Sequence, residues 1–184
     1  LGTMSRITLG MLAVAFLATP SLHARQITSD RPGIGSGSAV LPHKTIQLEA
    51  GFEYANSTGT NAYSIGQALV RLGAPGFEVE LFFNSYVITR TDLLDNALDG
   101  EGFQDLGIGL KLPVFVDSSG RFSLAGQGIL QTPSGSVLQT NDEWIPTGIL
   151  LADLGLTDRL GVSINTGYQA GPGDVDGVFS LIVT

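Results

Sequence analysis

The residues with the clearest chemical potential in this chain are charged side chains that alternate with apolar ones along extended runs. In 77–83, Glu78 and Glu80 share one parity, whereas Phe77 and Val79 share the other. Successive side chains of a strand point to opposite faces, so such a run has one charged and one apolar face. Charges of both signs recur on this parity, which predicts that these side chains face a hydrated lumen. There they either line a path for solutes or form a network of ion pairs that fills the lumen. The predicted lumen-lining set is Gln47, Glu49, Glu53, Arg71, Glu78, Glu80, Asp105, Lys111 and Arg121.

Catalytic and metal-binding patterns are weak by comparison. His43 precedes the first predicted strand, and no nearby serine motif completes a Ser–His–acid set. The chain has no Cys, which excludes thiolate nucleophiles and thiolate metal ligands. The acidic stretch 92–101 lacks the spacing of an EF-hand, and the glycines of 33–37 do not follow a strand and open a helix. We therefore expect no enzyme activity, no metal and no cofactor.

Composition limits the class of partner. The formal net charge is −8, so nucleic acid is disfavoured because no basic patch is available to neutralise phosphates. Charged residues are only 14% and hydrophobic residues 43% of the chain, against about 25% charged in an average soluble domain.

The N-terminal stretch 4–24 has the features of a secretory signal peptide. Arg6 is followed by an apolar run over 7–18, and the stretch ends at the small residue Ala24. The run is shorter than the roughly 20 apolar residues of a spanning helix. Residues 1–3, before the first Met, are interpreted as an artefact of gene prediction or cloning. We expect residues 25–44 to be an ordered loop or tether, with a flexible linker as the alternative, and 45–184 to be the β domain.

Period-two alternation after residue 44 predicts eight strands. Their length of about ten residues suits a tilted membrane strand, which needs about 9–11. Several aromatics lie near predicted strand ends, as in an interfacial girdle, but simple counting gives Tyr86 and Phe103 the lumen parity. The predicted fold is an all-β, antiparallel up-and-down transmembrane β-barrel, complete in itself or part of a larger barrel. The predicted strands are 45–54, 63–72, 77–87, 103–112, 121–131, 144–154, 160–168 and 175–183.

Short motifs resemble one known family. Thr-Ser-Asp-Arg-Pro-Gly at 28–33, Leu-Glu-Ala-Gly at 48–51 and Asp-Leu-Gly-Ile-Gly-Leu-Lys at 105–111 resemble segments of the outer-membrane proteins named for the meta-pathway of phenol degradation. The resemblance implies a barrel in the outer membrane of a Gram-negative cell that helps small aromatic or hydrophobic compounds cross. It implies no catalytic residues. Members continue for about four more strands to a terminal aromatic residue, so we expect a C-terminally truncated chain.

The resulting hypothesis is a passive outer-membrane channel for small hydrophobic or aromatic solutes, with membrane lipid around it. Two alternatives remain open: a structural barrel with a plugged lumen, and a soluble secreted β-barrel that carries a ligand inside.

Overall fold

The computed structural model describes residues 30, 35–57, 60–91 and 99–184. The predicted signal peptide at 4–24, most of the first family-like motif and the aspartates at 92 and 95 lie outside these residues. Among the described residues, no helix is long and apolar enough to span a membrane.

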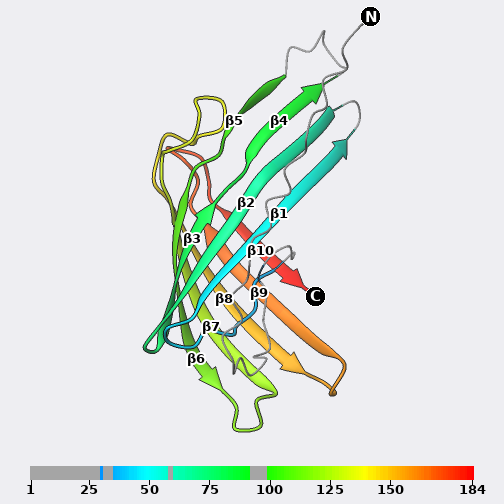
Figure 1. Ribbon diagram of the computed structural model, residues 1–184, viewed down its shortest axis with the longest axis vertical. Coiled ribbons are helices and arrows are strands. Elements are labelled where there is room, and N and C mark those ends of the chain that lie inside the picture. Colours follow the sequence, from blue (N-terminus) through cyan, green and yellow to red (C-terminus); the bar gives the residue numbers. More distant parts are fainter. Residues whose placement is uncertain (1–29, 31–34, 58–59, 92–98) are drawn as a thin grey trace, which may run out of the picture.

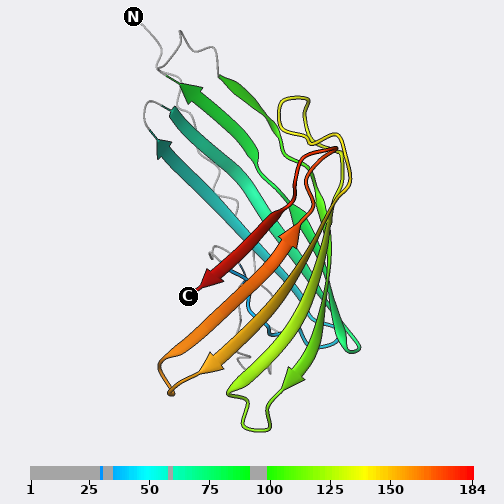
Figure 2. The same ribbon diagram turned by 180° about the vertical axis from the view of Figure 1, so that it is seen from behind.

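The described chain forms a single antiparallel sheet that curls into a half-barrel (Figures 1 and 2). The sheet order is β10-β9-β8-β7-β6-β3-β2-β4-β5, with β1 paired to β2. The strands are β1 (Ile46–Ser57), β2 (Thr60–Ala74), β3 (Phe77–Phe83), β4 (Tyr86–Thr91), β5 (Gly100–Phe103), β6 (Gly107–Val116), β7 (Phe122–Gln131), β8 (Ile145–Gly155), β9 (Gly161–Gln169) and β10 (Val178–Val183).

These ten segments correspond to eight strands of a meander. β3 and β4 both pair with β2 and are separated only by residues 84–85. β5 and β6 pair with β4 and β3 respectively, across a break at 104–106. All eight predicted runs therefore contain strands, and the all-β, antiparallel part of the fold prediction is confirmed. The connection between the predicted strands 77–87 and 103–112 is shorter than expected, because β4 runs to Thr91 and β5 begins at Gly100.

The two faces of the sheet have opposite polarity. The convex face carries large apolar side chains that are open to the surroundings, such as Leu110 at 42% and Leu181 at 70% exposure. The concave face carries Arg71, Glu78 and Lys111, all fully buried. Among the described residues, six hydrophobic and twelve polar or charged residues are buried. The interior of the half-barrel is therefore mainly polar, the reverse of a soluble domain's core.

Three neighbouring strands each contain an irregularity at the same level of the wall. Gly66 is an extra residue in β2, with a φ of 78° that favours glycine. The other two are the breaks at 84–85 and 104–106. We call these three places together the bulge line. Each break adds one residue, which shifts the period-two pattern by one position.

This shift corrects the parity predicted for two aromatics. Counting without bulges places Tyr86 and Phe103 in the lumen, but Phe103 is 62% exposed on the convex side. Tyr86 packs edge-on against it at a centroid distance of 4.8 Å. The buried positions beside the breaks are instead Ser85 and Asp105. The two rings thus join the apolar outer surface rather than interrupting it.

Candidate functional site

The centre of the concave face is a buried ionic network from three adjacent strands. Arg71 of β2 lies opposite Glu80 of β3, and Lys111 of β6 lies opposite Glu78 of β3. The ion pairs run diagonally across this register: Arg71 Nε lies 2.5 Å from Glu78, and Lys111 Nζ lies 3.3 Å from Glu80. Cross-strand neighbours of opposite charge stabilise a sheet, and here they fix the register of β2, β3 and β6.

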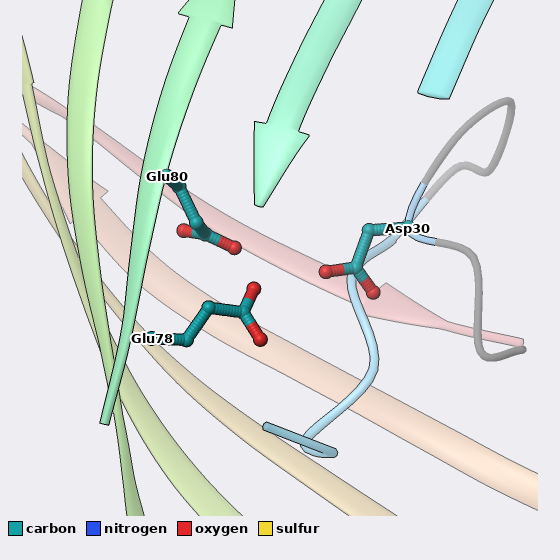
Figure 3. Close-up of side chains that lie close together, drawn as sticks. All are labelled: Asp30, Glu78 and Glu80. Atoms are coloured by element: carbon teal, nitrogen blue, oxygen red, sulfur yellow. The ribbon is translucent and has the colours of Figure 1, made fainter. Parts of the chain in front are cut away.

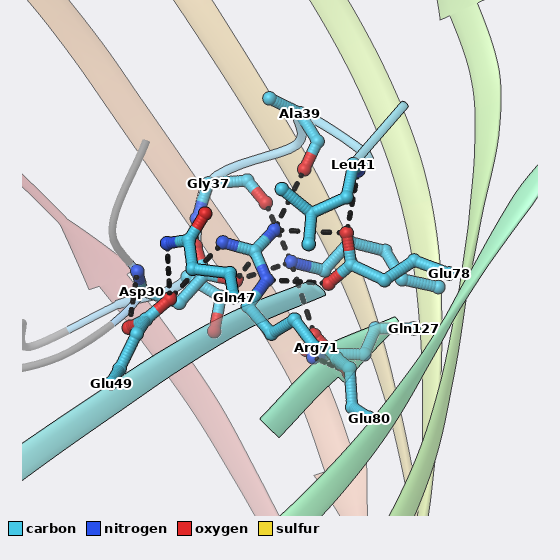
Figure 4. A network of polar contacts seen from close by, with 12 residues as sticks. Asp30, Gly37, Ala39, Leu41, Gln47, Glu49, Arg71, Glu78, Glu80 and Gln127 are labelled. Atoms are coloured by element: carbon cyan, nitrogen blue, oxygen red, sulfur yellow. Dashed lines mark hydrogen bonds and ion pairs between the residues drawn. The ribbon is translucent and has the colours of Figure 1, made fainter. Parts of the chain in front are cut away.

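Arg71 is the hub of the network (Figure 4). Its guanidinium donates Nε and Nη2 to the two carboxylate oxygens of Glu78, at 2.5 and 3.0 Å. Nη1 lies 3.3 Å from Glu49 of β1, and Nη2 lies 3.4 Å from Asp30. A planar guanidinium with five N–H donors suits this position, because it contacts three carboxylates at once while fully buried.

The N-terminal strap, defined as residue 30 and residues 35–44, lies in the concave trough. The carboxylate of Asp30 sits 2.5 Å from Lys111 Nζ, and its backbone N–H donates to Glu49 at 2.9 Å. Further along the strap, the backbone N–H of Leu41 donates to Glu78 at 2.7 Å. The luminal charges thus bind backbone and side-chain groups of the chain's own N-terminal part.

The strap is also fastened to the opposite wall of the trough. Asp153 of β8 accepts hydrogen bonds from the backbone N–H and the hydroxyl of Ser38, both at 2.6 Å. Asn165 of β9 donates to the carbonyl oxygen of residue 36 at 2.8 Å. Contacts on β2, β3 and β6 on one side and on β8 and β9 on the other show that the strap bridges the trough.

The charges of the network do not balance. Four buried carboxylates, on Asp30, Glu49, Glu78 and Glu80, face the two cations of Arg71 and Lys111. Oxygens of Asp30, Glu78 and Glu80 lie within 4.8 Å of one another (Figure 3). The ammonium of Lys111 contacts Asp30 and Glu80 and supplies a positive charge within this acidic group. By formal charge, acidic groups therefore outnumber basic groups in the trough.

The predicted lumen set is only partly brought together. Glu49, Arg71, Glu78, Glu80 and Lys111 form the network, and Gln47 joins it by donating to Glu49 at 2.9 Å.

The other three predicted residues lie elsewhere. Asp105 is buried, but it holds the loop 132–143 by accepting backbone N–H groups of Ser134, Gly135 and Asn141 at 2.8–3.0 Å. Glu53 is exposed near the far end of β1. Arg121 differs from the prediction: it precedes β7 in a turn, its side chain is 64% exposed, and its nearest acid is Asp158 at 3.9 Å.

Several important partners were missed. Gln127 shares the inward parity of its strand and donates to Glu80 at 2.6 Å, so parity alone could have found it. Asp153 lies between apolar neighbours in β8, a pattern that marks an inward polar residue. Asp30 could not be predicted from the sequence, because the segment around it has no hydrophobic periodicity. His43 is exposed in the turn before β1.

Comparisons with known proteins add no assignment: no protein-family model, no curated protein and no solved structure matches the chain.

Proposed function

We propose that this chain forms the wall of an outer-membrane β-barrel that passively passes small hydrophobic or aromatic solutes. The proposal includes export by the N-terminal signal and contact of the convex face with lipid. The family resemblance, to the outer-membrane proteins named for the meta-pathway of phenol degradation, supports the same function and is itself part of the proposal.

The observation that carries the proposal is the inverted polarity of the sheet. Convex side chains such as Leu48 at 70% and Phe179 at 81% exposure would contact water in a soluble protein, at a cost of about 25 cal/mol for each Å² left unburied. The concave face instead hides fully buried charges. A β-structure in lipid needs this arrangement, with apolar residues outward and polar residues inward.

The strap favours a second candidate function, a structural barrel with a plugged lumen. It bridges the trough through Lys111 on one side and Asp153 on the other, as a segment that plugs a lumen would. Under the transport proposal, solutes must either displace the strap or avoid it.

Flux through reconstituted protein separates the two functions. Liposomes that contain the purified chain are mixed with a small neutral phenol, and uptake is compared with protein-free liposomes. Protein-dependent uptake supports transport, whereas uptake of phenols, benzoates and sugars no faster than in protein-free liposomes would rule transport out. The third possibility, a secreted ligand carrier, predicts recovery in the soluble periplasmic fraction after cell fractionation.

A further inference from the structure

An apolar pocket lies on the convex surface where the bulge line crosses the wall. Its volume is about 410 Å³, within the usual range of about 300–1,000 Å³ for small-molecule sites. The apolar part comes from Ile65, Phe83, Tyr86, Phe103 and Leu106. The side chains of Ile65 and Phe103 are 48% and 62% exposed, so the pocket faces the surroundings of the barrel.

A polar pocket of about 200 Å³ also lies at the bulge line. It is lined by Asp105, which is buried, and by Gln131, which has the same inward parity as Gln127 of the network. This second pocket therefore belongs to the concave side of the sheet.

Two amide side chains line both pockets. Asn84 and Gln104 border the apolar pocket and the polar pocket alike. They come from the two breaks, which are adjacent in the wall. The outer and inner pockets therefore share these two residues of the wall.

The backbone ladder is thin at this point: between the pairs Phe82–Gly107 and Tyr86–Phe103, the N–H of Gln104 donates to the carbonyl oxygen of Ser85 at 3.0 Å, and side-chain hydrogen bonds supplement it. Asn84 donates Nδ2 to the carbonyl oxygen of Asp105 at 2.6 Å. Gln104 accepts, through Oε1, the hydroxyl and backbone N–H of Ser85 at 2.8 and 3.3 Å. Opening the wall here therefore costs this one backbone hydrogen bond and the contacts of the two amides, rather than the full ladder of a regular strand pair.

We propose that the bulge line is a side port through which a small aromatic solute with one hydrogen-bonding group passes between the apolar outer pocket and the polar inner pocket. This inference rests on the proposed function and names its route. The port lies in the part of the wall formed by β3–β6, and the residues that line the two pockets do not belong to the strap.

The chemistry of the solute follows from the lining. Phe83, Tyr86 and Phe103 offer aromatic surface, and ring pairs contribute about 0.5–1.5 kcal/mol beyond area burial. The backbone partners fix the amide orientations, so Asn84 presents Oδ1 and Gln104 presents Nε2 without a hydrogen-bond partner among the described residues. A phenol-like hydroxyl can donate to the first and accept from the second. The buried Asp105, which lines the inner pocket, disfavours carboxylate analogues.

The test uses the absence of native cysteine. Asn84→Cys places one thiol at a residue that lines both pockets; it removes one hydrogen-bonding group and is expected to lower uptake, so the effect of reaction is measured against the unreacted variant. Leu48→Cys is the matched control, since Leu48 is an exposed convex residue of β1 outside both pockets. Each purified variant is reconstituted in liposomes, reacted with benzyl methanethiosulfonate, and assayed for 4-fluorophenol uptake before reaction, after reaction and after reduction with dithiothreitol.

Reaction is expected to remove most of the protein-dependent uptake of Asn84→Cys, and reduction is expected to restore it, which shows that the fold is intact. The control should be unchanged throughout. Unaltered uptake after confirmed modification of Asn84→Cys would overturn the port.

A binding measurement keeps the inference testable if no flux exists. In methyl-labelled wild-type protein, 4-fluorophenol should give a saturable shift at Ile65 and none at Ile46, an equally apolar convex residue outside the pocket. Equal, non-saturable shifts at both residues would refute a specific site. Saturable binding of 4-fluorophenol without protein-dependent uptake would refute the transport function alone. Protein-dependent uptake, with no saturable binding at Ile65 and no loss of uptake after modification of Asn84→Cys, would refute the port alone.

Discussion

Replacing Arg71 by methionine removes the hub of the trough while keeping a side chain of similar length. Two carboxylates lose their closest cation, Glu78 at 2.5 Å and Glu49 at 3.3 Å, and Asp30 loses a second, longer contact at 3.4 Å. Asp30 keeps its contact with Lys111. Glu78 also keeps its hydrogen bond from the strap, but that neutral donor replaces no charge.

The size of the effect follows from the burial of these groups. A unit-charge pair at 3.3 Å is worth about 5 kcal/mol at an effective dielectric constant of about 20, before desolvation costs are counted. Removing one partner of a buried ion pair costs about 3–5 kcal/mol, because the other charge stays buried and uncompensated. We expect Arg71→Met to lower the free energy of unfolding by that amount. Adding Glu78→Gln should recover about 1–3 kcal/mol.

The assay is urea unfolding of the protein in lipid vesicles, followed by circular dichroism and by the fluorescence of Trp144. Arg90→Met is the matched control, since Arg90 is 48% exposed and its nearest acid is Glu101 at 3.0 Å. Exposed pairs contribute about 0–1 kcal/mol, so this variant should unfold almost as the wild type does. An Arg71→Met protein as stable as Arg90→Met would refute the view that the network holds the concave face together.

Two further substitutions probe the strap and the loop above the trough. Asp153→Ala removes the acceptor that fastens the strap to β8, so residues 35–44 should become more sensitive to protease and single-channel conductance should rise. Asp158→Ala is the control, because the Asp158 side chain is 99% exposed, and it should change neither property. Unchanged protection of the strap from protease in Asp153→Ala would contradict the bridging contact. Gly135→Ala brings a Cβ within 2.7 Å of a backbone oxygen and should lower the free energy of unfolding by about 1–3 kcal/mol in the same assay. Gly128→Ala is the control, because its Cβ meets open space, and its free energy of unfolding should change by less than about 0.5 kcal/mol. Equal losses in the two variants would show that the loop is not packed as described.

Period two was sufficient to predict much of the sheet. Glu78 and Glu80 alternate with apolar neighbours, and this identified both the strand and the charged face. Pairing followed from short connections, because consecutive antiparallel strands usually lie side by side. The five charged residues of the network that belong to regular strands were accordingly found.

The failures have local causes. Bulges insert one residue without any change in composition, so Tyr86 and Phe103 were assigned to the wrong face. Arg121 has the right parity but precedes the strand, and strand ends are poorly marked in sequence. The strap has no periodicity at all. Asp30 reaches Lys111 across 81 positions, a contact that only the folded sheet defines.

The central claim is that the convex face contacts lipid and the concave face does not. Leu130 and Gln131 test it directly, because they are adjacent in β7 at one depth and point to opposite faces. A single tryptophan is placed at either position in a Trp144→Phe background, and the protein is reconstituted with brominated phospholipid. The account predicts strong quenching by the brominated lipid at position 130 and little at 131, with quenching by aqueous acrylamide in the reverse order. Equal quenching at both positions, or no lipid quenching at 130, would contradict it.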